Sequence, residues 1–72
     1  MKKVLAESMM SYLSGQIAYH KANVAVYLTS PVGIGEHPDI MAALEEELAK
    51  VAEYQEKYDV LGQLLMDKDI NG

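Results

Sequence analysis

The chain contains no cysteine, tryptophan, phenylalanine or arginine, and only two prolines in 72 residues. Without cysteine, neither a disulfide nor a thiolate metal site can stabilise the fold. A chain of this length forms one domain, residues 1–72, and the core of such a small domain stabilises it only weakly. Well-packed helices and self-association are the remaining sources of stability.

Long apolar runs and clusters of basic residues are also missing. No apolar run reaches the roughly 18 residues needed to span a bilayer, so we expect no membrane insertion and a cytoplasmic location. Residues 1–35 carry a net charge of +2 and residues 36–72 a net charge of −7. Phosphate binding needs clustered Lys and Arg, so direct binding of nucleic acid is not expected. The charge imbalance favours antiparallel packing of the two halves.

Half of the residues are apolar, and their spacing predicts a first helix over about residues 3–29. One apolar stripe at helical periodicity contains His20 together with Met10, Leu13, Ile17, Val24 and Tyr27. Additional apolar residues widen the stripe to roughly 200° of the helix circumference, about twice what a surface helix needs. A single neighbouring helix cannot cover this arc, so we predict two neighbours.

A second helix is predicted over about residues 38–66, with the loop at about 30–37 and a polar tail at 67–72. Its apolar seam repeats as a heptad of Leu44, Leu48, Val51, Gln55, Tyr58 and Leu65, with Met41 and Leu61 at the edges. Glu-to-Lys pairs at i,i+4 mark the solvated face. Two helices of equal length joined by a short loop predict an all-α, antiparallel helical hairpin.

The surplus apolar surface predicts a homodimeric four-helix bundle. Large side chains lie on one flank of the first helix, beside the stripe that faces the second helix. We expect this flank to form the dimer interface, and its members are Leu5, Met9, Tyr12 and Tyr19.

Polar residues interrupt the apolar arcs of both helices and form a candidate polar layer. Gln16, His20 and Asn23 lie on the first helix, and Glu47 and Gln55 lie on the second. A turn near residue 33 or 34 places His20 opposite Glu47, and a buried carboxylate requires such a partner. A layer that fixes the helix register is the main interpretation, with a pH switch or a ligand contact as the alternative. No metal ligand set, cofactor motif or catalytic constellation is present, so the sequence predicts no cofactor and no enzyme.

The loop "PVGIGEHPD" has a structural explanation at most positions. Pro31 ends the first helix, and Pro38 suits the first turn of the second, with His37 as its N-cap residue. The apolar loop residues Val32 and Ile34 close the end of the bundle or, with His37, contact a partner. His-Pro-Asp also occurs in J-domain cochaperones, but the resemblance covers only these three residues.

The stretch "YHKANVAVYLTSPVGIGEHPDIMAALEEELAKVAEYQEKYDVL", from Tyr19 to Leu61, resembles small helical proteins of tailed bacteriophages, including cyanophages. That group has no characterised activity, so the resemblance implies a phage origin and no catalytic residues. We therefore expect a non-enzymatic interaction module that binds itself and a host or phage protein in the bacterial cytoplasm. A structural component of a virion or ordered assembly, or an accessory to phage replication and recombination enzymes, is the alternative.

Overall fold

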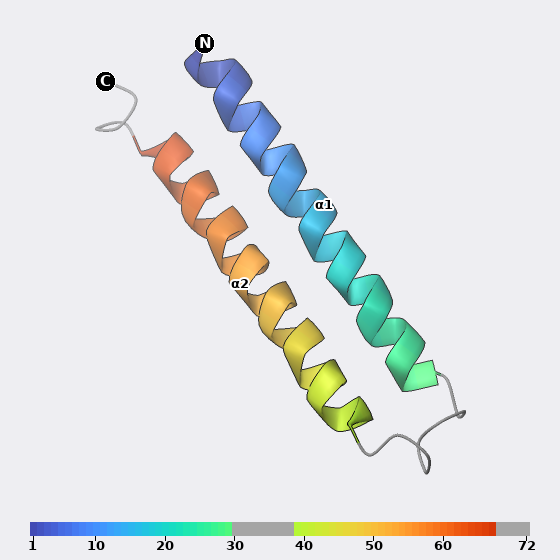
Figure 1. Ribbon diagram of the computed structural model, residues 1–72. Helices are drawn as coiled ribbons and strands as arrows, with labels where there is room; N and C mark the ends of the chain where they lie inside the picture. Colours follow the sequence, from blue (N-terminus) through green and yellow to red (C-terminus); the bar gives the residue numbers. More distant parts are fainter. Residues whose placement is uncertain (30–38, 68–72) are drawn as a thin grey trace.

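Two α-helices lie side by side and antiparallel in the computed structural model, which describes residues 1–29 and 39–67 (Figure 1). Helix α1 spans Lys2–Thr29 and helix α2 spans Ile40–Met66. Both ends of α1 and the end of α2 fall within one residue of the sequence prediction. Helix α2 begins two residues later than predicted, at Ile40. The described residues thus form an all-helical hairpin.

Local hydrogen bonds occupy some of the polar groups at the helix ends. At the end of α1, the Thr29 hydroxyl donates to the Ala25 carbonyl oxygen at 2.7 Å. Asp39 is the N-cap residue of α2, and its carbonyl oxygen accepts from the Ala43 amide at 2.9 Å. After α2, the Asp67 amide donates to the Leu64 carbonyl oxygen at 3.2 Å. These bonds occupy backbone or side-chain groups that would otherwise need water at the frayed ends.

The core of the hairpin is small. Among the described residues, only Leu13 and Ile17 are buried, with exposed fractions of 4% and 9%. Half-buried side chains extend this contact along the seam between the helices, and they include Met10, His20, Val24 and Tyr27 on α1 and Leu44, Glu47, Val51, Tyr54, Tyr58, Leu61 and Leu65 on α2. One side of each helix therefore packs against the other helix, while the remaining sides stay open.

The hairpin is long and thin. It measures 56 × 17 × 14 Å and has a radius of gyration of 16.6 Å, whereas a compact domain of this length has a radius near 11 Å. An elongated shape of this kind gives a large surface for the mass of the chain. No helix in the described ranges is both long enough and apolar enough to cross a membrane.

Candidate functional site

A polar cluster joins the two helices within the seam. The His20 Nδ1 atom lies 2.6 Å from Glu47 Oε1, and Asn23 Nδ2 donates to the same oxygen at 3.0 Å. His20 and Asn23 lie on one face of α1 because they are three residues apart. The side chains of His20 and Glu47 are 13% and 21% exposed, so the cluster is partly shielded from solvent.

The two donors change the acidity of Glu47. The hydrogen bond from His20, and after it the hydrogen bond from Asn23, lowers the pKa of the Glu47 carboxyl below its usual value. An ionised carboxylate can only accept hydrogen bonds, so the bridging proton resides on His20 Nδ1. The cluster therefore acts as a two-donor clamp on one carboxylate oxygen.

Aromatic rings surround the imidazole of His20. The Tyr54 ring stacks on it with a centroid separation of 5.8 Å and an interplanar angle of 10°. Tyr19 meets the imidazole edge-on at 4.8 Å and 71°, and Tyr12 meets Tyr54 edge-on at 6.2 Å and 84°. The Lys57 Nζ atom lies 5.2 Å from the centroid of the Tyr54 ring, within the range of a cation–π contact. The cluster therefore lies beneath a row of tyrosines that reaches the surface.

The Tyr12 phenol has a raised pKa. Its hydrogen bond with Tyr54 is the main cause, followed by charge repulsion from the same phenol. Tyr12 therefore stays protonated and does not serve as a phenolate base near neutral pH. An imidazole, an amide, a carboxylate and neutral phenols can bind and orient other groups, but this set contains no activated nucleophile.

The predicted polar layer forms in part. The structure brings His20, Asn23 and Glu47 together, and Gln16 is half-buried nearby on α1. Gln55 is half-buried on α2 like Tyr54, and its side chain donates to Asp59 at 3.1 Å, one turn further along the helix, rather than to this cluster.

All four residues of the predicted dimer interface lie on the outside of the hairpin. Leu5, Met9, Tyr12 and Tyr19 are 63%, 49%, 52% and 59% exposed. The predicted partner loop, with Val32, Ile34 and His37, lies outside the described residues. The structure thus places the large-residue flank of α1 in solvent and leaves it available for a contact.

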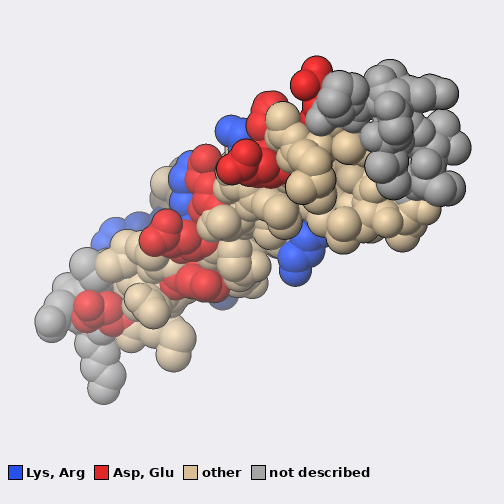
Figure 2. Space-filling model, turned by 90° about the horizontal axis from the view of Figure 1, so that it is seen from below, with Lys and Arg blue, Asp and Glu red and all other residues tan. Residues whose placement is uncertain are grey.

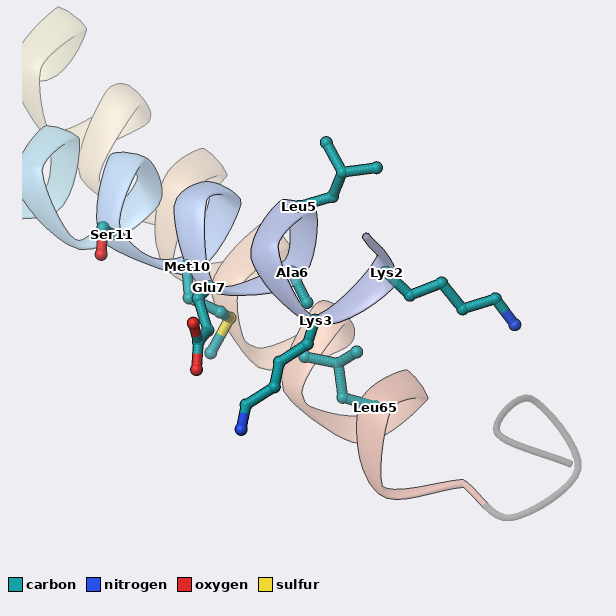
Figure 3. Close-up of a pocket in the computed structure, with 8 residues that line it drawn as sticks. All are labelled: Lys2, Lys3, Leu5, Ala6, Glu7, Met10, Ser11 and Leu65. Atoms are coloured by element: carbon teal, nitrogen blue, oxygen red, sulfur yellow. The ribbon is translucent and has the colours of Figure 1, made fainter.

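An open groove of about 950 Å³ runs along the first turns of α1 (Figure 3). Leu65 of α2 forms one wall, and the other lining residues belong to α1: Lys2, Lys3, Leu5, Ala6, Glu7, Met10 and Ser11. The sequence does not predict this groove, because it depends on how the end of α2 is placed beside the start of α1. Its apolar floor and two lysines make it a surface for contact rather than an enclosed pocket.

The charges of the hairpin are mostly acidic and exposed. Figure 2 shows acidic side chains along most of the visible face, with a few lysines among them. The Lys57 ammonium donates to Glu53 at 2.9 Å on the solvated side of α2 and lowers the pKa of that carboxyl. Within residues 1–29 and 39–67, no three His, Asp or Glu side chains are grouped closely enough to hold a metal ion.

Comparison of the chain with known protein families, curated proteins and solved structures finds no match.

Proposed function

We propose that this chain is a non-enzymatic protein–protein interaction module of a tailed bacteriophage. In this proposal it pairs with itself into a homodimeric four-helix bundle and binds a host or phage protein in the bacterial cytoplasm. The exposed apolar surface of α1 is the observation that carries the proposal. Leu5, Tyr12 and Tyr19 are each more than half exposed, and tyrosine suits interfaces because it combines a large apolar area with a polar tip.

The total surface area supports self-association. The chain exposes 5664 Å², whereas a compact protein of 8.0 kDa exposes about 4,400 Å². The elongated chain therefore exposes about 1,200 Å² more than a compact monomer of its mass. A typical specific interface buries about 800 Å² on each partner, and burial of part of this surface in a dimer is in the usual range.

A second exposed apolar surface on α2 supports binding of another protein. Met41 and Leu48 are 70% and 50% exposed, and they share a helix face because they lie seven residues apart. A dimer that forms through the flank of α1 leaves these two side chains in solvent. They therefore form the candidate contact for the host or phage partner.

The chemistry of the polar cluster supports a role without catalysis. The His20 imidazole is hydrogen-bonded to the carboxylate of Glu47, and the Asn23 amide donates to the same carboxylate. Such a cluster fixes the relative position of two helices and provides specificity of packing. It supplies neither a nucleophile nor a general base aimed at an open pocket.

Two measurements test the proposal. Sedimentation equilibrium at micromolar concentration should give twice the 8.0 kDa mass of the chain, and a folded monomer would overturn the homodimer. Affinity capture from infected cells should recover a specific protein with the native chain and lose it with Leu48→Glu. Recovery of the chain alone would overturn the proposed partner, and high copy number in purified particles would favour a virion component.

A further inference from the structure

The exposed flank of α1 continues further than its four largest residues. Val26 is 61% exposed, and it extends the pattern of Leu5, Tyr12 and Tyr19 at intervals of seven residues. Met9, Gln16 and Asn23 occupy the second position of the same heptad. We call Leu5, Met9, Tyr12, Tyr19 and Val26 the outer stripe. A heptad of this kind is the pattern of a helix that packs along another helix. Helix α2 touches it at Tyr12 and leaves most of it exposed.

The outer stripe is continuous with the polar cluster. Tyr19 packs on the imidazole of His20, and Tyr12 packs on Tyr54, which stacks on the other side of the cluster. A helix laid along the outer stripe would therefore also cover the partly exposed His20–Glu47 pair. The cluster is half-enclosed by its own chain, and a partner helix would complete the enclosure.

A second copy of the chain is the occupant that the surface favours. It offers the same stripe, and a two-fold contact satisfies both stripes in one closed assembly. The five members of the outer stripe are each about half exposed or more in the single chain, so a second copy can bury both stripes along their whole length.

The charges distinguish two possible orientations of the copies. Lys2 and Lys3 lie at the start of α1, and the first half of α2, at the opposite end of the hairpin, carries the exposed carboxylates of Glu45 and Glu46. Parallel pairing would place the two lysine pairs beside each other. Antiparallel pairing places each lysine pair beside the acidic end of the other copy. Charge complementarity of this kind fixes orientation more than it adds affinity.

We infer that the outer stripe of α1 binds the outer stripe of a second copy in antiparallel orientation, and that this contact closes over the His20–Asn23–Glu47 cluster. The inference rests on the self-association proposed above. It adds the contact face, the direction of the two helices and the enclosure of the cluster by the partner helix.

Spin labels test the orientation, because the chain has no native cysteine. Four exposed positions at seven-residue intervals lie off the outer stripe: Val4, Ser11, Ala18 and Ala25. Each of these residues is replaced by Cys in a separate variant, and the cysteine is spin-labelled. In an antiparallel dimer the two labels at Val4, or at Ala25, are separated along the axis by about 30 Å, whereas those at Ser11 or Ala18 are close to the two-fold axis.

The expected result of electron double resonance is therefore a longer distance at Val4 and Ala25 than at Ser11 and Ala18, by about 10 Å or more. One distance at all four positions would show parallel pairing and overturn the orientation. Loss of dimer on labelling, with the native chain still dimeric, would place the contact on the labelled face and overturn the outer stripe. A monomeric native chain would instead overturn the proposed function, so the failures are distinguishable.

A matched pair of substitutions tests the contact face. Val26 and Leu28 are 61% and 68% exposed on the same helix, but only Val26 belongs to the outer stripe. Val26→Glu should weaken the dimer about 100-fold or more, because it buries an unpaired carboxylate. Leu28→Glu should leave the dissociation constant within about threefold. Circular dichroism of both variants shows that the helices persist, and equal effects on dimerisation would overturn the assignment.

Enclosure of the cluster is measured through Tyr19, whose ring contacts His20. In the dimer, the ring protons of Tyr19 and His20 should lose contact with solvent, and their nuclear magnetic resonance signals should shift between low and high chain concentration. Val26→Glu should give the low-concentration signals at every concentration. Identical ring signals in the dimer and in Val26→Glu would overturn the enclosure while leaving the dimer intact.

Discussion

Leu5 and Leu13 lie about two turns apart on the same helix, yet 63% of the Leu5 side chain is exposed and only 4% of Leu13. The residue type and the secondary structure are the same. The difference arises because Leu13 faces α2 whereas Leu5 lies on the outer stripe. A single neighbouring helix covers one side of α1, so an apolar residue is buried only if it faces that side. The second apolar side of α1 is exposed in the single chain, and it is the side on which we propose that a second copy packs.

The largest expected effect is the difference in stability between the Leu13→Ala and Leu5→Ala variants. Leu13→Ala should destabilise the hairpin by about 2–5 kcal/mol, because it opens a cavity in a core of two buried residues. Leu5→Ala in dilute solution should change the stability by less than about 0.5 kcal/mol, as for other exposed positions. Urea unfolding followed by circular dichroism measures both. Equal losses would show that the outer stripe is already covered within one chain.

At higher chain concentration, the destabilisation caused by Leu5→Ala should approach that caused by Leu13→Ala. If the outer stripe is buried in the dimer, Leu5→Ala then costs roughly 1.5–3 kcal/mol per chain, the transfer free energy of a buried leucine. The thermal midpoint of the native chain should also rise with concentration, because dimerisation stabilises the folded state by mass action. A midpoint that does not depend on concentration would contradict both expectations.

Much of the fold follows from the sequence alone. The two uninterrupted stretches on either side of the Pro- and Gly-containing segment predict both helices and their antiparallel arrangement. The loop position and the helix lengths also place His20 opposite Glu47 in the hairpin register. These features depend on local spacing, and local spacing can be read directly from the sequence.

The face of α2 that meets α1 could not be predicted as well. Two apolar seams are possible on α2, and both contain Leu44, Val51, Tyr58 and Leu65. The first seam adds Leu48 and Gln55, and hydrophobicity favours it because of Leu48. The second seam adds Glu47, Tyr54 and Leu61. In the structure Leu48 is 50% exposed, whereas Glu47, Tyr54 and Leu61 are half-buried, as is Gln55.

The contacts of the second seam explain this choice. Glu47 faces α1 because His20 and Asn23 both donate to its carboxylate, and these hydrogen bonds offset the cost of partial burial. Tyr54 faces α1 because it stacks on His20. A hydrophobicity pattern considers each helix by itself, so it does not register a polar residue whose partners lie on the other helix.

A smaller effect is expected on the stability of the hairpin at acidic pH. The folded-state pKa of Glu47 lies below its usual value of 4.5 because His20 and Asn23 donate to the ionised form. Its contribution to stability is therefore complete above that value and is lost as the pH falls through the lowered pKa. Glu47→Gln should remove this part of the acid destabilisation. Glu46→Gln, at an exposed neighbouring position, should retain it, as measured by thermal melts between neutral and acidic pH. The same acid profile in both variants would contradict a role for the clamp.

The smallest effect is expected on the third side of α1, where small residues line a shallow groove with Tyr58. A Cβ atom added at Gly15 would meet nothing within 4 Å in the described structure, whereas one added at Gly62 would lie 4.0 Å from the Met10 side chain. Leucine has a higher helix propensity than glycine by up to about 1 kcal/mol. Gly15→Leu should therefore stabilise α1 slightly and leave the dimer intact.

The comparison with Gly62 makes this small effect informative. Gly62→Leu gains the same helix propensity, but its Cβ atom is already in van der Waals contact with Met10 and the rest of the leucine shares the seam with that side chain, so it should be less stable than Gly15→Leu. Thermal melts and sedimentation equilibrium on the two variants separate propensity from packing. If Gly15→Leu dissociates the dimer while its helicity is unchanged, the small-residue side is the contact and the outer stripe is not. If it remains dimeric, the small-residue side stays in solvent and the outer stripe remains the proposed contact.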